Sequence, residues 1–211
     1  MHYTKQQIEK MERIKRLKII NAVSGIKPAN LIGTVSDEGK TNVAIFSSVV
    51  HLGSDPALMG FIMRPVGEVP RHTYENILQN GQYTINHIHQ TFIKNAHYTS
   101  AKLDRGDSEF LRCGLTEEFL EEFNAPFVKE SKLKIGLQFL EAINIRLNGT
   151  ILIVGEIKHL VVPEELIGND LDLDLSLVNT VGISGLNTYY SLEKIAEYPY
   201  VRASEMPDFE N

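Results

Sequence analysis

Short apolar runs alternate with turn-forming residues along most of this chain, and that pattern predicts a protein built mainly from β-strands. The runs that we expect to form strands are NLIGTV (30–35), TNVAIFSSVVHL (41–52), ALMGFIM (57–63) and QYTINHI (82–88). Turn sequences such as SDEGK, in which Gly39 can adopt a positive φ, separate them. We therefore expect antiparallel strands, with the first two forming a hairpin.

The strongest local signal is the segment 133–162, LKIGLQFLEAINIRLNGTILIVGEIKHLVV. Two long β-prone runs flank Asn148-Gly149, the residue pair that type I′ hairpin turns prefer. The segment predicts a second, longer hairpin. In QYTINHI, Tyr83 and Ile85 should share one face of the strand, because side chains alternate along a strand.

Helical segments are few and short. We predict a helix over 4–16 capped by Thr4, a helix over 73–80 closed by Gly81, helical structure within 90–123 with one start at Thr116, and a short helix near the C-terminus. Residues 16–25 are compatible with a helix or a strand. Several antiparallel strands and few helices favour a closed or nearly closed barrel, because closure removes exposed strand edges. The interior of a small barrel is filled by side chains, so a large ligand has to bind at a mouth, a groove or a subunit interface.

The bulk composition is that of one globular domain. The chain has 211 residues, 43% of them hydrophobic and 23% charged, with a net charge of -6. The negative charge argues against a non-specific nucleic-acid binder. The first twenty residues carry six Lys/Arg against two Glu, so residues 1–25 could form a basic helix on a membrane, but a solvated helix at the rim or at a subunit contact is the better interpretation. Cys113 is the single cysteine, and no signal peptide or membrane-length apolar run is present, so we expect a cytoplasmic protein without disulfides.

The segment MRPVGEVPRHTYENI (63–77) gathers cations and a hydroxyl where an apolar strand gives way to a helix. Helix N-termini present unpaired N–H groups, and Arg offers a forked donor that matches phosphate oxygens. The segment therefore predicts a phosphate site, and the alternative is an N-capping Thr73 beside solvated Arg and His. No P-loop motif and no G-x-G-x-x-G occur, which argues against a Walker-type or Rossmann nucleotide site.

Two adjacent serines, Ser47 and Ser48, interrupt an apolar strand. Because neighbouring side chains point to opposite faces, we expect one hydroxyl to face inward. A buried hydroxyl needs a partner, which is either a nearby carbonyl or a ligand.

Signals for metal binding and for nucleophilic catalysis are weak. His87 and His89 form an H-x-H pattern without further ligands, and we interpret them as a surface pair. Asp170, Asp172 and Asp174 alternate with leucines, but the segment lacks the Gly and Glu of an EF-hand loop. No G-x-S-x-G motif is present. We therefore predict no metal site and no catalytic side chain.

The ordered set NLIGTVSDEGKTNVAIFSSVVHLGSDPALMGFIMRP, RHTYENILQNGQYTIN, HYTSAKLDRGDSEF, GLTEEF and GLNTYY resembles the flavin reductase-like proteins. This resemblance covers about 30–190. It implies the FMN-binding split barrel, which is a mainly β, antiparallel, Greek-key-like barrel with peripheral helices. The whole chain, 1–211, would then be one such domain with 1–25 as a helical extension, and it would act as a homodimer.

The resemblance also assigns the site. The flavin phosphate would lie at Arg64, Arg71, His72 and Thr73, and the isoalloxazine ring along Ala44, Ile45, Phe46, Ser47 and Ser48, while His97, Thr99, Ser100 and Tyr189 would lie near the flavin. The implied activity is NAD(P)H-dependent flavin reduction, with NADH or NADPH as donor and flavin N5 carrying the chemistry. Two alternatives are a non-catalytic flavin-binding protein for storage or sensing, and an unrelated small barrel.

Overall fold

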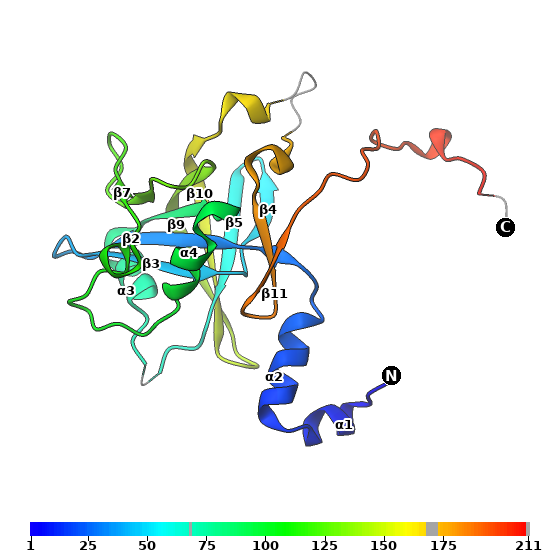
Figure 1. Ribbon diagram of the computed structural model, residues 1–211, viewed down its shortest axis with the longest axis horizontal. Helices are drawn as coiled ribbons and strands as arrows, with labels where there is room; N and C mark the ends of the chain where they lie inside the picture. The colour runs from blue at the N-terminus through cyan, green and yellow to red at the C-terminus, as the bar shows by residue number, and fades with distance from the viewer. Residues whose placement is uncertain (68, 168–172, 210–211) are drawn as a thin grey trace.

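The centre of the molecule is a seven-stranded antiparallel sheet (Figure 1). The computed structural model describes residues 1–67, 69–167 and 173–209. The strands follow the order β3-β2-β6-β9-β10-β5-β4. Their bounds are β2 Asn30–Val35, β3 Thr41–Phe46, β4 Val50–Ser54, β5 Ala57–Met63, β6 Gln82–His87, β9 Lys134–Ile145 and β10 Thr150–Val161. The predicted antiparallel strands and both hairpins are confirmed.

The order of the strands forces the sheet to close. β3 is first and β4 is last, yet only residues 47–49 connect them, so the two edges must come together. The Ser48 hydroxyl completes the closure because it donates to the carbonyl of Ile62 in β5 (3.0 Å) and accepts from the Ile62 N–H (3.1 Å). The predicted single strand over 41–52 is therefore wrong. The chain turns at Ser47, where a side chain replaces the ladder bonds.

The inner face of the barrel is packed with apolar side chains. The largest of them include Ile32, Phe61, Tyr83, Leu137 and Ile153, each with no measurable exposure. Tyr83 and Ile85 share this face, as the alternation predicted. Thr84 points the other way and donates to the carbonyl of Pro126 (2.7 Å).

A second core lies outside the barrel, between β2 and β3 and a smaller three-stranded sheet, ordered β1-β11-β12. This sheet consists of β1 Lys27–Pro28, β11 Val181–Ser184 and β12 Thr188–Ser191. Helices cover the barrel at several places: α3 His72–Asn80, η1 Gln90–Phe92, α4 Ile93–Tyr98, α5 Glu109–Cys113, η2 Glu164–Leu166 and η3 Leu175–Val178. α3 places Ile77 in the barrel core and ends at Gly81, whose φ of 68° confirms the predicted cap.

The N-terminal segment forms two helices, α1 Lys5–Lys10 and α2 Arg13–Ala22, where one helix over 4–16 was predicted. The break has a local cause. Thr4 and Gln7 cap α1, and the carboxylate of Glu12 accepts from the N–H groups of Ile14 and Lys15, so that a new helix starts. Both helices project from the barrel and bury no side chain (Figure 1).

Two predicted helices are absent. Thr116 leads into β7 Glu117–Glu118, which pairs with β8 Phe127–Val128, because Lys129 N–H donates to the Thr116 carbonyl (2.9 Å) and sets up a strand pair. The tail after Ser191 is extended instead of helical, with only η4 Ala203–Glu205 as regular structure. A short helix is marginal unless an apolar face is buried, and all described tail residues are exposed.

The turn between β9 and β10 is not the predicted type I′. Residues 146–149 form it, and Gly149 has a φ of 73° whereas Asn148 is not in the left-handed region. Asn148 uses its side-chain carbonyl to accept from Thr150 N–H and Oγ1–H instead. No helix in the described residues is long and apolar enough to cross a bilayer.

Candidate functional site

The N-terminus of α3 is open to an anion. Arg71 is the N-cap residue (φ -120°, ψ 74°), and no side chain accepts from the first-turn N–H groups. The N–H of Arg71 itself donates to Glu75 Oε1 (3.2 Å). The next amides therefore keep free donors at the positive end of the helix dipole, which is the arrangement that binds phosphate in proteins.

Cations surround this helix start. Arg64 is exposed directly after β5, and Arg71 uses Nε to donate to the Pro65 carbonyl (3.3 Å), so the rest of its guanidinium remains available. A third cation, Arg105, was not predicted from the sequence, and it forms an ion pair with Glu75 (2.7 Å). The only signal in the sequence was a basic residue in the loop SAKLDRGDSEF, and nothing there says that this loop returns to α3.

His72 and Thr73 connect α3 to the beginning of β3. His72 lines a shallow cleft together with Ser36, Lys40, Thr41, Asn42, Asn76, Arg105 and Asp107. Thr73 is buried, and its hydroxyl accepts from Asn42 Nδ2 (3.1 Å). Thr73 is therefore not the helix cap. It holds the cationic helix start against the strand.

One edge of β3 has no partner strand, because among the described strands β3 pairs only with β2, and we call the part of this outer edge after Val43 the open edge of β3. The buried carboxyl of Glu109 accepts from Val43 N–H, and burial raises the pKa of that carboxyl. Because backbone groups alternate in direction along an antiparallel strand, Ile45 also faces the outer edge, while Ala44 and Phe46 face β2. Of the three main-chain positions predicted to line a ring, Ile45 is therefore the one whose N–H and carbonyl face the outer edge.

The two serines have different roles. Ser48 is fully engaged with the backbone of Ile62, as described for barrel closure. Ser47 is half-buried and has no hydrogen-bond partner within the described residues. The structure thus separates the two possibilities that the sequence left open: Ser48 is a satisfied structural hydroxyl, and Ser47 is free to contact a ligand.

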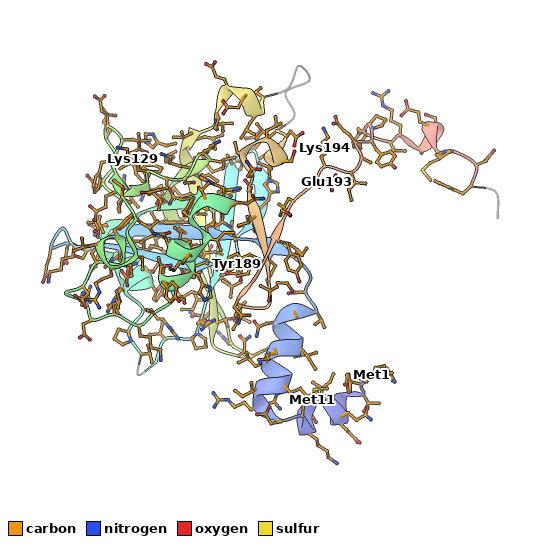
Figure 2. All side chains as sticks on the ribbon, in the orientation of Figure 1. Met1, Met11, Lys129, Tyr189, Glu193 and Lys194 are labelled. Carbon is orange, nitrogen blue, oxygen red and sulfur yellow. The ribbon has the colours of Figure 1, made fainter. Side chains whose placement is uncertain are left out.

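A wide-open surface cavity of about 460 Å³ lies between η1, α4 and the β11–β12 turn. Two of the predicted site residues, His97 and Tyr189, line this cavity. The Tyr189 hydroxyl forms a 3.0 Å hydrogen bond with His97 Nδ1. Burial raises the pKa of Tyr189 to about 12, so this hydroxyl keeps its proton. Figure 2 labels Tyr189, which lies on β12 of the small sheet. The complete lining is Gln90, Thr91, Ile93, Lys94, His97, Tyr98, Asn187 and Tyr189.

The other six lining residues were not predicted, although α4 itself carried a signal. Ile93, Lys94, His97 and Tyr98 follow helical i, i+3, i+4 spacing and therefore share a face. Thr99 closes α4 by donating to the Ala96 carbonyl (2.7 Å), which uses its hydroxyl within the protein. The neighbouring Ser100 is exposed.

β3 joins the two parts of the site. Its first residues, Thr41 and Asn42, line the cleft of His72, and Ile45 packs against the same buried cluster as Ile93 and Tyr189 at the cavity. From Thr41 to Phe46 a strand extends about 17 Å. Arg64 follows Ile62 by two residues, so Ser48 holds the beginning of the cationic loop near the far end of β3, and the loop returns to the start of α3, where Arg71 Nε donates to the Pro65 carbonyl. The outer edge of β3 therefore runs from the cationic start of α3 to the cluster that contains Tyr189, and Arg64 lies in the loop between the two ends.

The histidine pair is not at the surface, which corrects the sequence interpretation. His89 is buried with Nε2 bonded to the Glu130 carbonyl (2.6 Å), and His87 Nδ1 is buried on the barrel's inner face. No group of three or more metal-ligating side chains occurs in the part of the chain that the structure describes. Asp170 and Asp172 lie outside the described residues.

Comparison with protein families gives a match to the flavin reductase like domain over residues 26–178. Among curated proteins, an uncharacterized protein of Bacillus subtilis, YwrF, is 23% identical over 128 residues. That alignment covers 61% of this chain and 62% of the Bacillus protein, so the chain spans less than two thirds of that relative.

Solved structures give a closer match. A candidate flavin reductase with a split barrel domain from Shewanella frigidimarina is 48% identical, and the alignment covers 95% of this chain and 100% of the other with a TM-score of 0.91. Nitrilotriacetate monooxygenase component B from Bacillus cereus is 17% identical with a TM-score of 0.82, and the alignment covers 94% of this chain and 98% of that protein. Flavoredoxin of Desulfovibrio vulgaris is 22% identical with a TM-score of 0.71, and the alignment covers 83% of this chain and 91% of that protein. The last two similarities show the split-barrel fold alone.

Proposed function

The chain belongs to the flavin reductase-like family of flavin-related oxidoreductases, and we propose that it is an NAD(P)H-dependent reductase that binds FMN. The observation that carries the proposal is the open edge of β3, which runs between the cationic start of α3 and the aromatic cavity. An elongated ligand with an anion at one end and a planar ring at the other fits this strip. FMN has that shape.

The donors that the chain leaves free match those that FMN requires. The uncapped amides of α3 and the guanidinium groups of Arg64 and Arg71 suit a phosphate, because charge-assisted bonds to phosphate are strong and directional. The free hydroxyl of Ser47 and the outward main chain of Ile45 suit the polar edge of a flavin ring. His97 and Tyr189 supply a rigid aromatic wall, fixed by their mutual hydrogen bond.

The proposed task of the protein is to bind and orient. When bound, the flavin supplies the hydride chemistry, so the chain needs no acid–base side chain of its own. The cationic loop anchors one end, Ser47 sets the lateral position of the ring, and the apolar residues around Ile45 exclude water from one face. Lys94 and Tyr98 line the open side of the same cavity, which is the proposed approach for a nicotinamide nucleotide, with the cation available to its phosphates.

We extend the proposal to the assembly. The whole chain, 1–211, would form one domain with 1–25 as an extension, and it would act as a cytoplasmic homodimer. Support comes from the exposed apolar side chains of both terminal segments, which are typical of surfaces that another subunit covers.

The test is a titration of purified protein with FMN, followed by steady-state consumption of NADH and of NADPH in the presence of FMN. Saturable binding with nicotinamide oxidation supports the proposal. A colourless protein that neither takes up FMN nor oxidises either nucleotide overturns it. Tight FMN binding without any turnover indicates the alternative, a flavin-binding protein for storage or sensing.

A further inference from the structure

The two N-terminal helices expose an apolar surface that nothing in the described chain covers. The exposed fractions along α2 are 53% for Ile14, 41% for Leu17, 49% for Ile20 and 73% for Val23, which is the C-cap residue. Isolated surface leucines and isoleucines are common, but here four recur at i, i+3 spacing along one helix. Each successive side chain is rotated by about 60° from the previous one, so the four form an oblique apolar band around α2. An exposed apolar band of this length is typical of a surface that another element covers.

The C-terminal segment has the same property. Residues 191–209 are all exposed, and from Leu192 to Ala203 they run as an extended arm away from the barrel (Figure 1). An arm that stays free in solution is usually poor in large apolar residues. This arm carries seven: Leu192, Ile195, Tyr198, Tyr200, Val201, Met206 and Phe209. Tyr198 and Tyr200 are 83% and 88% exposed.

The two segments carry opposite charge. Residues 1–25 contain six Lys/Arg and two Glu, a net charge of +4. Residues 192–211 contain five Asp/Glu and two Lys/Arg, a net charge of -3. A basic helix pair with exposed apolar side chains and an acidic aromatic arm are therefore complementary in both polarity and charge.

We propose that two copies of this chain exchange arms, so that the acidic C-terminal arm of each copy packs on the α1–α2 helices of the other. This inference extends the proposed homodimer and is independent of flavin binding. Within one copy, α2 precedes β1 and the arm follows β12, and these strands are the opposite edges of the three-stranded sheet. Figure 2 shows Met1 and Met11 on one projection and Glu193 and Lys194 on the other, and the two projections diverge.

The reach of the arm suits a neighbouring subunit. Residues 192–209 can span up to about 60 Å when extended, which is far beyond the barrel surface from which they leave. In a two-fold dimer the exchange is reciprocal, so each arm finds the same helical face and no apolar surface stays open. An anionic membrane is a less suitable partner for the same helices, because it would repel the acidic arm.

Charge reversal tests the exchange in the full chain. One variant carries Lys5→Glu, Arg13→Glu and Lys18→Glu, which changes the helical segment from +4 to -2. The other carries Glu193→Lys, Glu197→Lys and Asp208→Lys, which changes the arm from -3 to +3. Lys5→Glu and Arg13→Glu place acidic residues in the first turns of α1 and α2, which favours the helix dipole, and Glu is a good helix former at position 18, so the helices should persist.

In a dimer of either variant alone, the arm and the helices that it meets carry charge of the same sign. In a mixed dimer, each arm meets helices of the opposite sign. We expect limited proteolysis to cleave the arm at least about tenfold faster in either variant alone, and a 1:1 mixture to restore the original rate and the dimer mass by light scattering. Docking of the arm on its own helices predicts no rescue by mixing, and that result overturns the proposal. An unchanged cleavage rate in either variant alone also overturns the proposal. So does a dimer whose arms are cleaved rapidly in the original protein, in both variants and in their mixture. None of these readouts uses flavin, so a failure here leaves the proposed function standing.

Discussion

The hydroxyl of Tyr189 and the imidazole Nδ1 of His97 lie 3.0 Å apart, although the two residues are separated by 92 positions in the chain. Their rings also meet edge to face, with centroids 5.8 Å apart. One ring comes from α4 and the other from β12, so this pair fixes the small sheet against the helix at the rim of the cavity. It gives the site a wall that exists before any ligand binds.

Replacing Tyr189 with Phe should raise the Kd for FMN by roughly 2- to 12-fold, because it removes a hydrogen bond worth about 0.5–1.5 kcal/mol and frees the imidazole to rotate. The measurement is flavin titration. Tyr190→Phe is the matched control, since Tyr190 is the next residue of β12, points to the opposite face and is 42% exposed. Equal effects of the two substitutions would show that the pair does not contribute to the site.

Arg64→Ala and Arg71→Ala should each weaken FMN binding by about 1–3 kcal/mol, or roughly 5- to 150-fold, because each removes a charge-assisted contact to phosphate. Riboflavin, which lacks the phosphate, should bind both variants and the original protein about equally. Lys129→Ala removes an exposed cation beyond β8 and serves as the control. A parallel loss of riboflavin affinity would place these arginines elsewhere than at the phosphate.

Ser47→Ala and Ser48→Ala should have opposite consequences. Ser48→Ala leaves the N–H and carbonyl of Ile62 without their partner and should reduce the free energy of unfolding by about 1–3 kcal/mol. Ser47→Ala breaks no bond within the described protein, so it should leave stability within about 0.5 kcal/mol and lower flavin affinity instead. Urea unfolding and flavin titration on the same two samples separate these effects. A stability loss for Ser47→Ala would mean that its hydroxyl is structural.

Stability should fall as the solution is acidified from pH 6.5 to pH 4. Burial lowers the pKa of His87 from 6.5 to about 4, so between these values the unfolded chain binds a proton that the folded chain does not. The free energy of unfolding therefore decreases toward low pH, by up to about 1.4 kcal/mol per pH unit and about 3 kcal/mol in total.

Urea midpoints across this range provide the measurement for His87. His87→Asn removes the titrating group and should flatten this part of the profile, while His51→Asn, at an exposed position of β4, should not. A profile that is equally steep in the His87 variant would assign the acid sensitivity to other groups.

The local elements of the fold were predictable because their causes are local. Gly81 and Gly39 adopt the positive φ that the sequence suggested, and alternation placed Tyr83 and Ile85 on the inner face of β6. Where the sequence-based prediction failed, a distant residue was responsible. Thr116 starts a strand because Lys129 pairs with it, and the 41–52 run breaks because Ser48 bonds to Ile62.

The candidate site shows the same division. The cationic helix start at 71–73 could be recognised from sequence, since a turn, a helix start and arginines are all local features. Arg105 and the pairing of His97 with Tyr189 could not be recognised, because each depends on a loop or strand returning from far along the chain.

By itself, the sequence determined the strands, their inward faces, the helix that could hold a phosphate and the resemblance to flavin-binding barrels, because residue type and spacing act over a few residues. Only the tertiary structure decided which serine is free, which backbone edge is open, that His89 is buried while His87 faces the barrel interior, and that the terminal segments are left uncovered. Those properties depend on which distant atoms become neighbours when the sheet closes, and no local pattern encodes them.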